Sequence, residues 1–356
     1  MKLLDKFRSI APARADLAGG TLDLWPLYCL VPGSATLNVA LDLFASADFE
    51  VWENPHFILE LKSGKEAYSL NRLEGVDFLN QAPLSLRFPL FVVREFLKQQ
   101  EVLPSISLKI QFSSPVPVGS GLGGSSTLLV ALARGLCRVC SDYLEQGWQW
   151  RFLSWAKDTE ASFLKLPTGT QDYLAAIFGG LHGYRFQSGA IQQTHYSQKV
   201  FKELNERILI VFSGEKHHSG LSNWEVYQRA IAADPKVLNG LERIAGVASF
   251  LDKALREEKV DWNQVGKLLS EEWRVRKETF SVSTPHLDQM VSQIENTGIL
   301  GVKVCGAAQG GSLVALVSPE NKASVLLALQ KYKLNILPCQ ATQTGVSLHD
   351  SSYDPD

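Results

Sequence analysis

The sequence contains no run of about 18 consecutive apolar residues, so it predicts no membrane-spanning helix. Its first twenty residues carry scattered charges and no continuous apolar stretch, which does not resemble a secretory signal. A strong charge of either sign is also missing, because 35 Lys and Arg face 37 Asp and Glu for a net charge of −2. We therefore expect no nucleic-acid partner and no membrane partner.

The sequence contains few cysteines, and their number is odd. Five cysteines in a chain of this size do not form the pattern of a disulfide framework. Cys137 and Cys140 make a C-x-x-C pair, but it lies late in an apolar helical run and has no second pair to complete a zinc site. We predict a buried structural role for this pair and a reducing, cytoplasmic location for the protein.

The apolar content, in contrast, is ample. With 356 residues and 45% hydrophobic side chains, the chain has material for about two domains. Residues 106–112 alternate apolar and polar side chains, as in a strand with one packed face. The second half instead carries long amphipathic helical patterns, and the stretch 188–206 between the halves is polar. We predict domains at residues 1–195 and 196–356.

A glycine-rich loop leads from the 106–112 strand into an apolar helix. It offers backbone N–H groups and a helix start to an anion, so it predicts a phosphate site. The candidate residues are Pro117, Gly119, Gly121, Leu122, Gly123, Gly124, Ser125 and Ser126. No Gly-Lys-Ser/Thr pair is present, which excludes a Walker P-loop. The loop also fits G-x-G-x-x-G, but the alternating strand and the intervening prolines disfavour a dinucleotide-binding dehydrogenase.

The segment Gly121-Leu-Gly123-Gly124-Ser125-Ser126 resembles the second signature of the GHMP kinases, P-x-x-x-G-L-G-S-S-A. This superfamily includes galactokinase, homoserine kinase, mevalonate kinase and phosphomevalonate kinase. Gly124 stands where the family has its first serine, Ser125 matches the second, and Ser126 occupies the alanine position. The resemblance implies that this loop binds the phosphates of ATP.

Two further segments extend the resemblance to both ends of the chain. Residues 11–23 are similar to the sugar-kinase form of the first signature, A-P-x-R followed by G-G-G-T-D, with an extra Leu22 before Asp23. Residues 301–311 are similar to the third signature, with Ala308 and Gln309 in place of two glycines. By this resemblance the substrate-binding residues are Gly19, Gly20, Thr21, Asp23, Gly306, Gly310 and Gly311.

Two carboxylates supply the chemistry that the resemblance implies. Glu160, with the Ser125 hydroxyl, would hold Mg²⁺, for which both are suitable hard oxygen ligands. Asp172 follows Gly169-Thr-Gln171, similar to the family's S/T-G-x-Q-D, and would accept or orient the proton of the substrate hydroxyl. Taken alone, Glu160 would be interpreted as an exposed helix residue and Asp172 as a helix cap.

Arg14 and Asp23 complete the set of candidate residues. Arg14 occupies a position where the family carries Lys or Arg, and a cation there would keep Asp172 ionised and offset charge on the transferring phosphoryl group. The alternative is a surface arginine. Asp23 matches the family aspartate that binds sugar hydroxyls, because an ionised carboxylate accepts several hydrogen bonds. Its alternative is a turn residue.

One polar loop leaves two interpretations open. Lys216 in the segment 213–220 offers charge to a substrate phosphate, and the adjacent His217 and His218 lack the partners of a metal site. The following stretch 219–225 resembles a segment of heptose-phosphate kinases. It is equally an ordinary capped helix start.

The resemblance as a whole implies an α+β fold of two domains. The N-terminal domain would be ribosomal-S5-like and the C-terminal one ferredoxin-like, with ATP and substrate between them. The implied function is ATP-dependent phosphorylation of a sugar or sugar phosphate, similar to heptose-7-phosphate 1-kinases, by a monomer or homodimer. Two alternatives remain, a mevalonate-type kinase and a non-catalytic sugar-sensing homologue.

Overall fold

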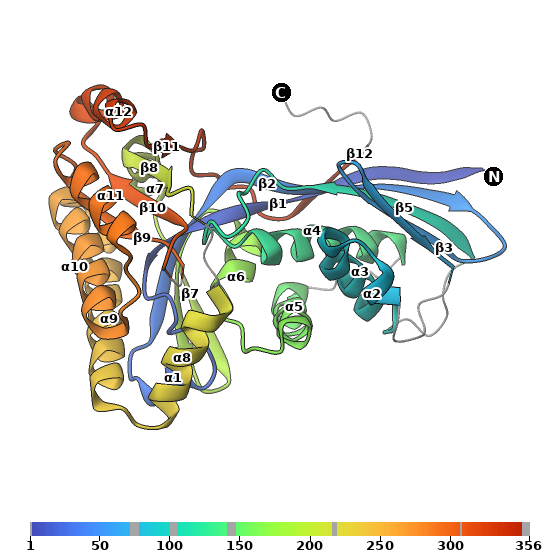
Figure 1. Ribbon diagram of the computed structural model, residues 1–356, viewed down its shortest axis with the longest axis horizontal. Coiled ribbons are helices and arrows are strands. Elements are labelled where there is room, and N and C mark those ends of the chain that lie inside the picture. Colours follow the sequence, from blue (N-terminus) through green and yellow to red (C-terminus); the bar gives the residue numbers. More distant parts are fainter. Residues whose placement is uncertain are drawn as a thin grey trace.

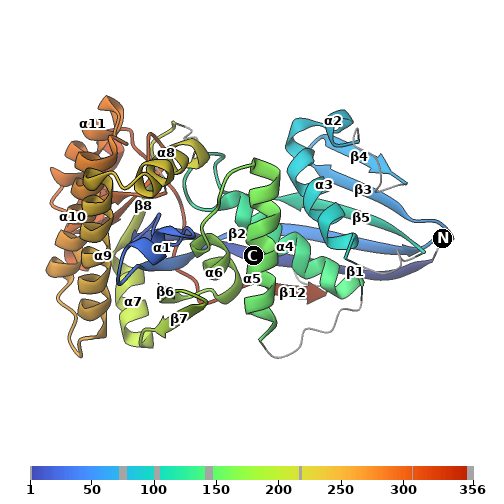
Figure 2. The same cartoon turned by 90° about the horizontal axis from the view of Figure 1, so that it is seen from below.

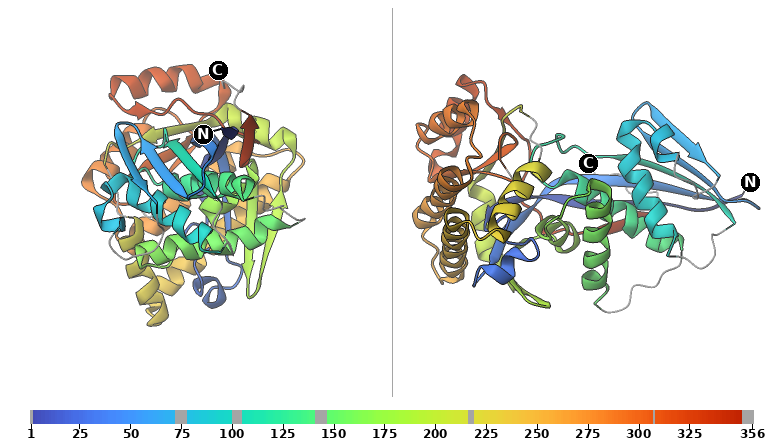
Figure 3. Two further views of the ribbon diagram at one scale, coloured as in Figure 1. Left: turned by 90° about the vertical axis from the view of Figure 1, so that its right-hand side faces the viewer. Right: turned by 60° about the horizontal axis from the view of Figure 1, so that its bottom comes forward.

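Helices and strands alternate around two sheets in the computed structural model, which describes residues 2–71, 78–99, 105–140, 147–215, 219–306 and 308–350. Figure 1 shows a large sheet along most of the molecule and a layer of long helices at one end. The views in Figure 3 place the N terminus at the opposite end. This mixture agrees with the expected α+β class.

The large sheet is built on two long antiparallel strands, β1 (Leu3–Ala18) and β2 (Ala35–Glu53). The early residues of β2 pair with β6 (Leu181–Gln187), and its later residues pair with β5 (Ile106–Ser113). The remaining strands are β3 (Ile58–Ser63), β4 (Glu66–Leu70), β7 (Ala190–His195) and β12 (Ser347–Asp350). Strand β3 runs parallel to β5, and β12 pairs with β1, so the chain returns to its first strand.

The helices of the first half lie together on one face of this sheet, as Figures 1 and 2 show. They are α2 (Phe78–Gln81), α3 (Leu84–Leu97), α4 (Gly124–Val139), α5 (Trp148–Leu164) and α6 (Gln171–Phe178). The alternation predicted for 106–112 is confirmed, since Leu108, Ile110 and Phe112 are buried in the core of this face. Cys137 is buried in the same core, as predicted.

The second sheet has the antiparallel order β11-β8-β10-β9. Its strands are β8 (Ile208–Phe212), β9 (Gly301–Val304), β10 (Ser312–Leu316) and β11 (Asn335–Ile336). The accompanying helices are α7 (Gln198–Arg207), α8 (Ser219–Ile231), α9 (Pro235–Arg256), α10 (Trp262–Phe280), α11 (Pro285–Glu295) and α12 (Lys322–Lys331). Figures 1 and 2 show α9, α10 and α11 at the outer end of the molecule.

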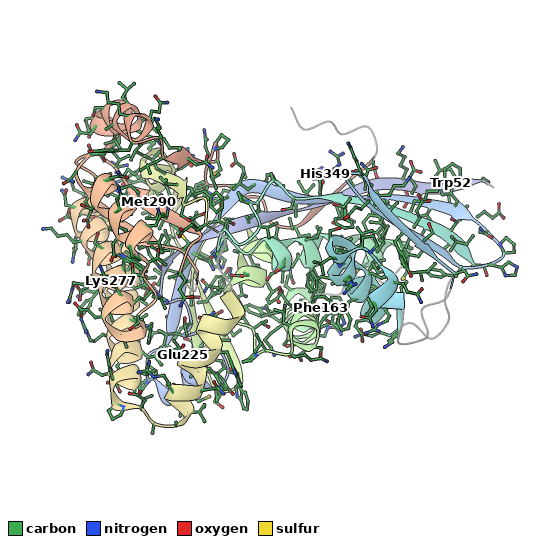
Figure 4. The ribbon with its side chains drawn as sticks, in the orientation of Figure 1. Trp52, Phe163, Glu225, Lys277, Met290 and His349 are labelled. Atoms are coloured by element: carbon green, nitrogen blue, oxygen red, sulfur yellow. The ribbon has the colours of Figure 1, made fainter. Side chains whose placement is uncertain are left out.

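The end of β1 packs against the second sheet. Ala13, Ala15 and Leu17 are buried in one apolar cluster with Ile210 of β8 and Val314 of β10. The residues after Ala18 therefore emerge where the two sheets meet. Side chains fill the space between β1 and the long helices (Figure 4). This packing fixes the position of the first motif relative to the C-terminal helices.

The chain passes from the large sheet to the small one between β7 and β8, and β12 returns it to the large sheet. Strand β7 ends at His195 in the large sheet, and β8 begins at Ile208 in the small one. The domain boundary at residue 195 remains a proposal. No helix in the described part of the chain is both long and apolar enough to cross a membrane.

Candidate active site

The glycine-rich loop ends at the N-terminus of α4, as its sequence indicates. Gly123 caps this helix with φ = +78°, in the left-handed region that favours glycine. A Cβ atom there would lie 3.0 Å from the Cγ of Asp172 and 3.1 Å from its Oδ2. Glycine at this position therefore serves both the turn into the helix and the placement of the Asp172 carboxylate against the loop.

Glu160 of α5 faces the start of α4, and its carboxylate accepts hydrogen bonds from three hydroxyl groups. Ser125 Oγ donates to its Oε1 over 2.5 Å, Ser126 Oγ donates to its Oε2 over 2.7 Å, and the hydroxyl of Tyr173 also donates to Oε2. Only 4% of Glu160 is exposed. Burial raises its pKa above the ordinary value, and the three donors offset part of that rise because they favour the ionised form.

The predicted metal ligands thus lie side by side. A serine hydroxyl and a carboxylate oxygen at a helix N-terminus form a donor set that fits Mg²⁺ bound to a phosphate chain. No group of three or more Asp, Glu, His or Cys side chains suited to a metal occurs among the described residues. Ser125 and Glu160 would hold the ion together with oxygens of the nucleotide, and these roles stay predictions.

Arg14 and Asp172, 158 positions apart in sequence, form a direct ion pair. Arg14 Nη2 lies 2.5 Å from Asp172 Oδ1, and its Nε donates to the same oxygen over 2.8 Å. Its Nη1 donates over 2.5 Å to the carbonyl oxygen of Gly121 in the glycine-rich loop. Arg14 is therefore not a surface arginine, since only 4% of it is exposed. Burial alone would lower the pKa of Arg14, but Asp172 and Asp16 together raise it.

Asp23 lies beside the same helix start as Asp172. Its Oδ2 accepts hydrogen bonds from the backbone N–H groups of Thr170 over 2.7 Å and Gln171 over 3.0 Å. The side chain is buried, and burial raises the pKa of Asp23 to about 6, although these N–H groups favour ionisation. The inserted Leu22 is fully buried in the apolar cluster of the C-terminal sheet. The insertion therefore leaves Asp23 next to Asp172 in the structure.

The third motif forms the loop between β9 and β10, and it touches the glycine-rich loop. Ser312, the first residue of β10, donates its N–H to the carbonyl of Ser120 over 2.7 Å. Gly306, Gly310 and Gly311 all have positive φ, and so do Ala308 and Gln309. The two substitutions therefore keep the backbone shape that glycine would allow. Lys216, His217 and His218 of the other polar loop lie outside the described residues.

Two sets of residues near these groups were not found from the sequence. Tyr173 follows Asp172 directly, but an aromatic residue in an apolar helix predicts only core packing. Glu272 and Arg276 on α10 contact the first motif from the second half of the chain. Their spacing of four residues is typical of a surface ion pair, so nothing local to them indicated burial.

Comparisons with known proteins agree with the motifs. Residues 88–180 match the family described as GHMP kinases N terminal domain, and residues 253–334 match GHMP kinases C terminal. The chain is 26% identical over 346 residues to the D-glycero-alpha-D-manno-heptose 7-phosphate kinase of Campylobacter jejuni, covering 95% of this chain and 97% of that protein.

Solved structures of this superfamily share the fold. The mevalonate kinase of Methanococcus jannaschii superposes with a TM-score of 0.75 at 20% identity, over 94% of this chain and 98% of that one. A D-glycero-D-manno-heptose 1-phosphate kinase from Bacteriodes thetaiotaomicron gives 0.74 at 24% identity, over 96% and 98%. These likenesses confirm the expected two-domain α+β architecture, with its ribosomal-S5-like and ferredoxin-like halves.

Proposed function

Because the chain belongs to the GHMP kinase superfamily, we propose that it is an ATP-dependent kinase that phosphorylates a hydroxyl group of a sugar or sugar phosphate. One observation supports this most strongly. Arg14 joins the Asp172 carboxylate to the carbonyl of Gly121, so a proton acceptor is held against the candidate phosphate loop. Phosphoryl transfer requires this proximity of a positioned nucleophile and a bound phosphate chain.

Each candidate residue has a role that its surroundings permit. Asp172 accepts or orients the proton of the substrate hydroxyl, and 26% of its side chain is exposed, so a ligand can reach it. Arg14 fixes that carboxylate and places positive charge near the transferring group. When bound, Mg-ATP supplies the phosphoryl group and the charge of the metal. The N-terminus of α4 favours its phosphates, and Ser125 with Glu160 would hold the ion.

The carboxylate of Asp23 favours a polyol over a mevalonate-type substrate. Its Oδ2 accepts two backbone N–H groups at the start of α6, beside Asp172, where a second hydroxyl of the same sugar would lie. The relative from C. jejuni is named as a heptose 7-phosphate kinase, which points to a sugar phosphate. A cytoplasmic location and a monomeric or homodimeric state remain part of this proposal.

The direct test is an ATP-consumption assay over a panel of hexoses, heptoses, their phosphates and mevalonate. We expect turnover with a sugar or sugar phosphate, dependent on Mg²⁺, and none with mevalonate. The Asp172→Asn variant serves as the control for contaminating kinases. If the wild-type protein binds a sugar but consumes no ATP with any member of the panel, the non-catalytic sensing alternative replaces this proposal.

A further inference from the structure

Four buried charged side chains connect the C-terminal half to the first motif. Lys303 Nζ of β9 lies 2.8 Å from Asp16 Oδ2 of β1 and 2.5 Å from Glu272 Oε2 of α10. Arg276 Nε lies 3.0 Å from Glu272 Oε1. The side chains are at most 3% exposed. Buried ion pairs add little net stability over apolar packing of the same volume, so their value here is positional.

Two of these side chains, Arg276 and Glu272, form hydrogen bonds with the backbone of the loop after β1. Arg276 Nη2 donates to the carbonyl of Gly20, and its Nη1 lies 3.4 Å from Thr21 Oγ1. The N–H of Gly19 donates to Glu272 Oε1 over 3.1 Å. Thr21 has φ = +76°, which a β-branched residue rarely adopts and which costs free energy unless the surroundings enforce it. Arg276 and Glu272 hold this turn from α10, and Asn223 of α8 accepts a hydrogen bond from Thr21 Oγ1 over 3.2 Å.

The left-handed Thr21 sends the next two side chains to different places. Leu22 enters the apolar cluster that contains Val211 and Leu241. Asp23 turns to the N-terminus of α6, where it accepts from the N–H groups that precede Asp172. The position of the candidate sugar anchor therefore depends on the turn at Thr21, whose backbone and side chain are contacted by Arg276 of α10 and whose hydroxyl also contacts Asn223 of α8.

We propose that Arg276, supported by Glu272, is a positioning residue for the sugar: it holds the Gly19–Thr21 turn so that Asp23 meets the substrate hydroxyls beside Asp172. This inference rests on the proposed kinase activity. Sugar affinity then depends on α10 of the C-terminal half through the turn alone. Lys277, next in sequence, lies on the outer side of the helix and shares none of these contacts (Figure 4).

The test is Arg276→Lys, which keeps the positive charge beside Glu272 but cannot reach Gly20 and Thr21 together. We expect the KM for the sugar to rise about 10- to 100-fold, as expected for the loss of charge-assisted hydrogen bonds. The KM for ATP and the kcat at saturating sugar should stay within about threefold of wild type. Arg274→Lys is the matched control, because Arg274 is on the same helix but pairs with Glu271 and Glu278 at the surface.

A second variant, Thr21→Val, keeps the side-chain shape and removes the hydroxyl that contacts both Arg276 and Asn223; the double variant with Arg276→Lys separates an effect through the turn from a direct contact of Thr21 with the sugar. Thr21→Val should raise the sugar KM several-fold on its own and add little in the Arg276→Lys background, because both act through one turn. It also carries the test if Arg276→Lys fails to fold. An unchanged sugar KM in either folded variant, or an equal rise of both KM values, overturns the inference. Absence of wild-type turnover would instead refute the proposed function.

Discussion

The ion pair between Arg14 and Asp172 carries the proposed chemistry, and removing its carboxylate charge is the sharpest test of it. Asp172→Asn keeps the shape of the side chain and an oxygen for Arg14 to contact. It removes the negative charge and the capacity to take a proton. Arg14 bonds to a single oxygen of Asp172, Oδ1, at 2.5 and 2.8 Å. The substitution therefore changes chemistry more than geometry.

The expected size of the effect follows from these roles. A positioned general base contributes about 10²–10⁴-fold to the rate, so kcat should fall by that factor in Asp172→Asn. Arg14→Ala removes an electrostatic contact worth about 10²–10³-fold in comparable sites. Independent effects would multiply to about 10⁴–10⁷-fold. Because both residues serve one transition state, we expect the double variant to fall little further than the worse single variant.

The assay is steady-state kinetics with the sugar found by the panel, together with calorimetric titration of Mg-ATP. Affinity for ATP should remain within a few-fold of wild type in Asp172→Asn, because that side chain does not belong to the phosphate loop. Asp48→Asn is the matched control. Asp48 of β2 pairs over 2.6 Å with Arg8, which lies on β1 as Arg14 does, but this pair is about one-third exposed and makes none of the loop contacts of Arg14.

Two results would refute the reasoning. A kcat of Asp172→Asn near that of wild type would show that proton acceptance by this carboxylate is not required. Full multiplication of the two single effects would show that Arg14 and Asp172 act in separate steps, which the shared oxygen contact does not predict.

Two more predictions concern the neighbouring carboxylates. Tyr173→Phe removes one hydroxyl donor to Glu160 and should weaken Mn²⁺ binding in the presence of ADP about 10- to 100-fold, measured by electron paramagnetic resonance. Tyr184→Phe, an equally buried tyrosine of the same core that does not contact Glu160, should leave it unchanged. Under the proposed function Asp23 would accept sugar hydroxyls in its ionised form, so the sugar KM should rise as pH falls through about 6, its raised pKa. Asp23→Asn should have a high KM that varies little between pH 5 and 7, and a wild-type pH profile in that variant would assign the titration to another group.

Helices and strands that show a clear apolar periodicity or a capping residue could be predicted from the sequence. Thr284-Pro285, a capping hydroxyl followed by proline, is a typical helix start, and α11 begins there with the threonine Oγ accepting from the N–H of Leu287 over 3.2 Å. The alternating strand at 106–112 and the helix after Gly123 also form where the pattern places them. Each of these signals is local, since it depends on side chains within one or two turns of chain.

The pairing of distant groups could be predicted only in part. The motifs indicated that Ser125 and Glu160 belong to one site, and they lie in contact. The burial of Lys303 could not be predicted, because a lysine in a strand usually faces water. Its buried ammonium group pairs with two carboxylates, that of Glu272, 31 positions earlier in the sequence, and that of Asp16, 287 positions earlier. Such convergence is a property of the tertiary packing and has no local signature.

In the third motif, Ala308 and Gln309 replace two glycines of the family signature but keep a left-handed backbone conformation. Ala308 and Gln309 have φ values of +67° and +62°, and each such conformation costs a non-glycine residue about 1–2 kcal/mol. The surroundings offset this cost. Gln309 donates its N–H to the carbonyl of Val282 over 2.7 Å, and the Ala308 methyl group is buried in the C-terminal apolar cluster. That methyl group therefore packs against apolar side chains of the C-terminal half. The contact between Ser312 and the carbonyl of Ser120 in the phosphate loop is retained beside it. At position 308 the departure from glycine therefore affects backbone stability, since the added methyl group packs in the core.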